Sequence, residues 1–76
     1  MDFATWLEKE KGFSHKGSRD AESRIKRVKG LLKDSSITQE TITELEKISD
    51  FTNLSISVKS QLRRSVKLYL EFSEKN

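Results

Sequence analysis

Four segments of the chain carry apolar residues at helical spacing, and this pattern restricts the fold more than any other feature of the sequence. Steps of three or four residues place such side chains on one face of an α-helix. Strict apolar–polar alternation, the pattern of a half-buried strand, is missing. The sequence therefore predicts a single all-α domain spanning residues 1–76, a compact bundle of four or five helices with short links.

The first two predicted helices have clear end signals. The first extends from Asp2, a good N-cap, to Lys11, just before Gly12, a residue suited to the left-handed turn that ends a helix. Its apolar face is Phe3, Trp6 and Leu7. The second covers residues 14–33, with Ser14 or Ser18 as N-cap. Its apolar face is Ala21, Ile25, Val28 and Leu32. We expect Gly17 and Gly30 to fray or bend it, because each costs about 1 kcal/mol relative to Ala within a helix.

Two further helices are predicted after a polar break at residues 34–36. The third follows Thr38 as N-cap and ends near Ser49, with apolar residues Ile42, Leu45 and Ile48. Residues 51–54 form a short connection whose Phe51 and Leu54 should fill the core. The fourth helix starts at Ser55 or Ser57 and ends near residue 73. Its apolar face is Val58, Leu62, Val66 and Tyr69, widened by Leu70 and Phe72.

Composition excludes several classes of function. The 76 residues include no Cys and one His, which argues against disulfides, thiol nucleophiles and a metal site. Only 33% of them are hydrophobic, too few for both a core and a large dry active-site pocket. Nucleotide-binding and catalytic motifs are missing. We therefore expect no enzyme activity and no cofactor. No apolar run approaches the ~20 residues of a membrane span, so we expect a cytoplasmic protein without a membrane partner.

Charge is distributed unevenly along the chain. Residues 14–33 carry seven basic and two acidic side chains, residues 34–50 one basic and five acidic, and residues 55–70 four basic and no acidic. In the last helix Lys59, Arg63 and Lys67 recur every four residues, so they share one side of it. Like charges at this spacing repel, which a polyanion would offset. A solvated face, or ion pairs with Glu40, Glu44 and Glu46, is the alternative explanation.

Other candidate side chains have simpler explanations. We expect His15 to lie on the surface, because it stands where a loop passes into a helix. Trp6 and Tyr69 are expected to anchor the core rather than stack on bases, because they lie on apolar faces and base stacking usually uses open sheet surfaces.

The order of these features resembles a known family. The segment Phe3-x-x-Trp6-Leu7 precedes Gly12-Phe13-Ser14 and a long basic helix. The last helix is a Ser-led run in which Leu62-Arg63-Arg64 is followed by Tyr69 and Phe72. The chain is similar in this order to the N-terminal, SAM-like core-binding domain of phage integrases and other tyrosine recombinases. The similarity extends over nearly the whole chain and consists mostly of apolar spacing.

The resemblance implies a helical bundle that clamps one side of a DNA duplex during recombination or integration, here as a prophage protein. It implies double-stranded DNA as partner, with a catalytic recombinase domain or another protein as a further partner. It does not imply catalysis, and Tyr69 belongs to the wrong domain to be the recombinase nucleophile. The implied contacts are phosphate contacts, with Arg63 or Arg64 best suited to a bidentate contact with guanine. The candidate DNA-binding residues are Arg24, Lys26, Arg27, Lys29, Lys33, Lys59, Arg63, Arg64 and Lys67.

A different class of function stays open. The uneven charge equally suits a small helical module of prophage or bacterial origin that binds another protein, or itself, through complementary faces and has no affinity for DNA. Dimerisation that disappears with added salt, together with absence of DNA binding, would indicate this second function.

Overall fold

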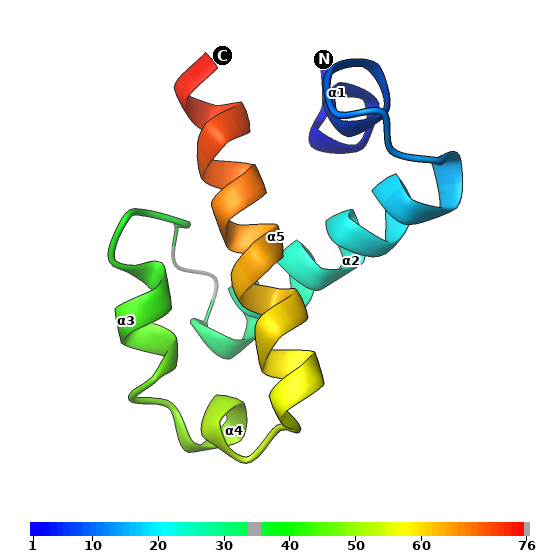
Figure 1. Ribbon diagram of the computed structural model, residues 1–76. Coiled ribbons are helices and arrows are strands. Elements are labelled where there is room, and N and C mark those ends of the chain that lie inside the picture. Colours follow the sequence, from blue (N-terminus) through cyan, green and yellow to red (C-terminus); the bar gives the residue numbers. More distant parts are fainter. Residues whose placement is uncertain (34–35, 76) are drawn as a thin grey trace.

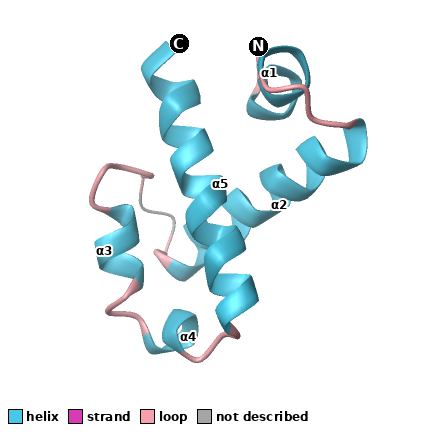
Figure 2. Ribbon diagram, in the orientation of Figure 1, coloured by secondary structure: helices cyan, strands magenta, loops and turns pink. Residues whose placement is uncertain are grey.

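The computed structural model describes residues 1–33 and 36–75, and these residues form five helices and no strand (Figures 1 and 2). The helices are α1 (Phe3–Glu10), α2 (His15–Leu31), α3 (Thr41–Leu45), α4 (Ser49–Thr52) and α5 (Ile56–Lys75). The prediction of an all-α domain is confirmed. The two long helices α2 and α5 pack against each other, and α1 lies at one end of the pair while α3 and α4 lie at the other (Figure 1).

Helix α1 begins and ends where the sequence predicts. The carboxylate of Asp2 accepts a hydrogen bond from the backbone N–H of Thr5 at 2.8 Å, which satisfies one of the free donors at the helix N-terminus. This hydrogen bond lowers the pKa of Asp2, because it stabilises the ionised carboxylate. Gly12 has a φ of 68°, the left-handed conformation that Gly adopts without strain.

Helix α2 includes both of its glycines, each close to one of its ends. Gly17 lies in the first turn, where its N–H donates to the Ser14 hydroxyl at 3.0 Å, so the N-cap stabilises the weak position. Gly30 precedes the last helical residue, Leu31. Lys33 then adopts a left-handed backbone with a φ of 56°. The predicted break at residues 34–36 lies outside the described residues except for Ser36.

The predicted third helix is shorter than expected, and a second short helix, α4, follows it. Helix α3 begins three residues after Thr38, and its N-cap Glu40 makes no side-chain capping bond. The Thr38 hydroxyl accepts the N–H of Glu40 at 3.2 Å, and the Thr38 N–H donates to the Thr41 hydroxyl at 2.8 Å. These local bonds compete with helix formation, so the helix starts later than predicted. Ile48 is extended and separates α3 from α4. Part of α4 lies in the segment predicted as a connection.

Helix α5 starts after Ser55, one of the two predicted N-caps. The Ser55 hydroxyl accepts the N–H of Val58 at 3.2 Å. The helix extends to Lys75, two residues beyond the predicted end. Its length allows it to contact α2 in the middle, α3 on one side and α1 near the C-terminus.

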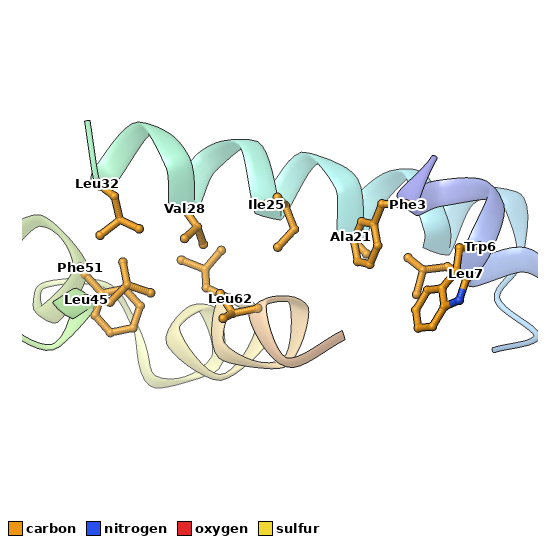
Figure 3. Close-up of a cluster of buried hydrophobic side chains, with 11 residues drawn as sticks. Phe3, Trp6, Leu7, Ala21, Ile25, Val28, Leu32, Leu45, Phe51 and Leu62 are labelled. Carbon is orange, nitrogen blue, oxygen red and sulfur yellow. The ribbon is translucent and has the colours of Figure 1, made fainter. Parts of the chain in front are cut away.

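One hydrophobic core connects all five helices (Figure 3). The apolar face of α2 points toward α5, and Leu45 of α3 and Phe51 of α4 fill the end beside Leu32. At the other end Phe3 of α1 contacts Tyr69 and Phe72 of α5, and Trp6 contacts Phe72, with ring centroids 5.2 to 5.6 Å apart. The predicted core roles of Phe51, Trp6 and Tyr69 are confirmed, since Phe51 and Trp6 are buried and Tyr69 is half-buried against the core.

Candidate nucleic-acid interface

The nine predicted DNA-binding residues differ in their surroundings. Lys26, Arg27, Lys33, Arg64 and Lys67 are exposed, whereas Arg24, Lys29, Lys59 and Arg63 are half-buried. Lys33 follows the end of α2, so it does not lie on that helix with Lys26 and Lys29. The set therefore contains cations that face solvent and cations that are half-buried against the bundle. One arginine from each group, Arg64 and Arg24, lines a shared groove.

Arg24 and Arg64 are brought together by the packing of α2 against α5. Both line a groove of about 370 Å³ at this contact, although they are separated by 40 positions in the sequence. Neither forms an ion pair with any carboxylate in residues 1–33 and 36–75. Two guanidinium groups from different helices thus border one concave surface, and neither is in an ion pair with a described residue.

The rest of the groove is partly polar and partly apolar. Asp20, from the turn of α2 that precedes Arg24, is the only carboxylate among its lining residues. Gln61, from the turn of α5 that precedes Arg64, adds an amide. The remaining lining residues are Phe13, Gly17, Ala21, Ser65 and Leu68. Asp20 and Gln61 were not predicted, because a lone acid and a lone amide give no signal until the helix contact is known.

Arg63 has a different environment from its neighbour Arg64. Its Nε and Nη2 lie 3.1 and 2.9 Å from the same carboxylate oxygen of Glu46, just after α3. Its guanidinium also lies 5.7 Å from the centre of the Phe51 ring. The guanidinium is therefore committed within the chain, and of the two arginines suggested for a bidentate guanine contact only Arg64 has an unpaired head group in the described structure.

Lys29 is also held by the bundle, since its ammonium lies 5.4 Å from the centre of the Tyr69 ring. Such a contact stabilises a cation modestly and still leaves it positively charged. Lys26, Arg27 and Lys67 have no ion-pair partner in the part of the chain that is described. They remain available to an anion from solution.

The structure limits the alternative in which the acidic segment neutralises the basic helices. Of Glu40, Glu44 and Glu46, only Glu46 pairs with one of the nine cations. Glu40 accepts a hydrogen bond from the Thr38 hydroxyl at 3.2 Å, within its own segment. Within residues 1–33 and 36–75, Arg63 is the single member of the nine with an ion pair.

His15 lies on the surface, as predicted, with 74% of its side chain exposed. Its Nδ1 is 3.4 Å from a carboxylate oxygen of Glu8, to which the buried Ser18 hydroxyl also lies close, at 3.1 Å. These contacts tie α1 to α2. The described residues contain no group of three His, Cys, Asp or Glu side chains placed to hold a metal ion.

None of the helices within the described ranges combines the length and the apolar character needed to cross a membrane. Comparison of the chain with protein-family models, with curated proteins and with solved structures found no match.

Proposed function

We propose that the chain binds the phosphate backbone of double-stranded DNA through α2 and α5 and has no catalytic activity of its own. One observation carries the proposal: eight of the nine cations on and beside these helices have no ion-pair partner in the described structure. Like charges concentrated on packed helices raise the energy of the folded chain. A polyanion that supplies the missing countercharge would remove this cost and release its own condensed counterions.

The proposal assigns different roles to different cations. The exposed Lys26, Arg27 and Lys67 would neutralise phosphates and attract the duplex from a distance, because flexible exposed cations contribute charge without fixed geometry. Arg24 and Arg64 would set the orientation, since planar guanidinium groups bind phosphate in a bidentate manner. Arg63 would contribute less, because the carboxylate of Glu46 competes for it.

The resemblance to the SAM-like core-binding domain of tyrosine recombinases belongs to this proposal as its finer part. In that setting the chain would hold one side of the duplex while a catalytic recombinase domain held the other. The five-helix architecture and the two long basic helices support this comparison. A module that supplies half of a clamp should bind DNA weakly and with little sequence preference, because most of its contacts go to phosphates.

The test is a fluorescence anisotropy titration of a labelled duplex at several salt concentrations. We expect the logarithm of the association constant to fall linearly with the logarithm of the salt concentration. With four to six phosphate contacts the slope is roughly −3.6 to −5.4. Replacing Lys26, Arg27 and Lys67 with Gln should flatten this slope, whereas Lys47→Gln, an exposed control beyond α3, should leave it nearly unchanged.

The opposite outcome is equally informative. If the wild-type chain leaves anisotropy unchanged even at low salt, the DNA-binding proposal is wrong. Sedimentation of the same sample would then show whether the chain associates with itself in a salt-dependent manner, which the acidic α3 segment and the basic helices would favour as complementary surfaces.

A further inference from the structure

We infer that the groove between α2 and α5 binds one phosphate group, held between the guanidinium groups of Arg24 and Arg64. The inference rests on the proposed function, because it identifies the backbone phosphate as the group that enters the groove. It goes further by assigning the position of that phosphate and the two residues that bind it.

The two arginines form a site because the fold fixes where they emerge. Ala21 and Ser65, the groove residues on the helix faces in contact, are buried, so the backbones at the base of the groove are held by core packing. Arg24 follows Ala21 by three residues and Arg64 directly precedes Ser65. Both guanidinium groups therefore extend from rigid helices rather than from loops, which reduces the ordering cost of binding.

The chemistry of the groove matches a phosphate. Each guanidinium carries five N–H donors in a planar arrangement that fits two phosphate oxygens. The Gln61 side chain adds an amide donor at the same surface. The groove, with a volume of about 370 Å³, is open to solvent, so a phosphate can approach both arginines from outside.

Asp20 weakens the attraction of the groove for any phosphate. The two arginines and one aspartate that line the groove give it a net charge of +1. The aspartate carboxylate repels inorganic phosphate or a phosphomonoester, which carries about −1.5 to −2 at pH 7, more strongly than it repels a phosphodiester with one negative charge. We therefore expect Asp20→Asn to increase affinity for duplex DNA about twofold, and to increase affinity for inorganic phosphate more.

A double-mutant cycle tests whether the two arginines share one phosphate. The variants are Arg24→Gln, Arg64→Gln and the combination, with Lys47→Gln as the matched loss of one charge. We expect each single Arg variant to weaken binding to the labelled duplex about fivefold, and the double variant to lose clearly less than the product of the two, because one phosphate is lost only once. Losses that multiply, or that equal the loss of Lys47→Gln, would overturn the inference while leaving DNA binding intact.

A second measurement separates the site from the function. Inorganic phosphate is titrated into the ¹⁵N-labelled chain, and the side-chain amide of Gln61 and the backbone amide of Gly17 are followed by NMR. Saturable shifts that disappear in the double Arg variant support the site. They would support it even if the duplex failed to bind, and the ligand of the site would then be free phosphate. Absence of such shifts, with duplex affinity unaffected by either Arg variant, excludes the site. Circular dichroism of each variant verifies that it is folded. Arg24→Lys, which keeps the positive charge, is a conservative second substitution at the same position.

Discussion

Several individual residues control where the helices of this chain begin and end. Asp2, Ser14 and Ser55 each accept a backbone N–H three residues ahead, at 2.8 to 3.2 Å. Short polar side chains suit this position because they satisfy donors that the helix itself cannot. Gly12 and Gly30 differ in backbone conformation, since Gly12 has a left-handed backbone and Gly30 does not. The consequences of these local geometries can be measured one residue at a time.

The first prediction concerns pH. The N–H of Thr5 holds the pKa of Asp2 below its ordinary value, so the folded state favours the ionised carboxylate. Asp2 therefore contributes stability above its ordinary pKa, and this contribution is lost as the pH falls through the lowered value. NMR titration of the Asp2 carboxyl carbon measures the pKa directly, and Asp2→Asn should remove this part of the acid dependence of unfolding. Titration at or above the ordinary pKa would contradict the prediction.

The second prediction compares two glycines. Gly30→Ala should raise the free energy of unfolding by about 0.5–1 kcal/mol, because the position is helical and an added Cβ meets no atom within 4 Å. Gly12→Ala should lower it by about 1 kcal/mol, because its φ of 68° is strained for Ala. Urea unfolding of both variants provides the measurement, and each serves as control for the other. Equal effects would show that backbone conformation does not determine the result.

At the scale of elements, the short helices α3 and α4 depend on the long ones. A five-residue and a four-residue helix cannot be stable alone, because helix nucleation is costly. Leu45 and Phe51 bury completely and attach these two turns to the core. The ion pair of Glu46 with Arg63 adds a polar connection from α3 to α5, in which both side chains are partly exposed. Burial therefore positions the two short helices, and the ion pair contributes little to stability.

The third prediction uses this ion pair. Glu46→Gln should change the free energy of unfolding by less than about 1 kcal/mol, because the pair is partly exposed. On the proposed function it should also increase affinity for duplex DNA about threefold to fivefold, since Arg63 becomes available to phosphate. Glu44→Gln on α3 removes the same charge without releasing Arg63. Equal effects of the two variants in the anisotropy assay would show that only net charge matters.

At the scale of the whole molecule, one core holds a domain with a radius of gyration of 12.1 Å and dimensions of 35 × 23 × 15 Å. The aromatic contacts of Phe3 and Trp6 with the C-terminal part of α5 join the two ends of the sequence. The same core also includes Leu45 and Phe51 at the far end. Loss of packing at either end should therefore destabilise the whole domain. The groove that Arg24 and Arg64 line lies where α2 meets α5.

The fourth prediction tests this unity. Trp6 is the single tryptophan of the sequence and is 3% exposed, so its emission reports on the contact of α1 with α5. We expect urea unfolding curves from Trp6 fluorescence and from far-ultraviolet circular dichroism to coincide, as for a two-state domain. Separate midpoints would contradict the prediction and indicate that α1 detaches before the other helices unfold.

The sequence by itself determined the all-α class, the limits of α1 and α2 to within two residues and the residues of the core. These follow from short-range physics: apolar spacing selects one helix face, and Asp2, Ser14, Ser55 and Gly12 satisfy or terminate backbone hydrogen bonding locally. The late start of α3 was not predicted, because local hydroxyl bonds of Thr38 and Thr41 offset the apolar spacing of Ile42, Leu45 and Ile48. The separation of α3 from α4 at the extended Ile48 was not predicted either.

Only the tertiary structure decided which cations share a surface. Periodicity placed Arg63 and Arg64 on one helix and Arg24 on another, but it could not specify how the two helices would pack. Their contact brings Arg64 to the groove of Arg24 and Asp20, while α3 brings Glu46 to Arg63. Charge interactions depend on distances through space, which are set by the way a bundle packs, and sequence spacing fixes those distances only within a single helix.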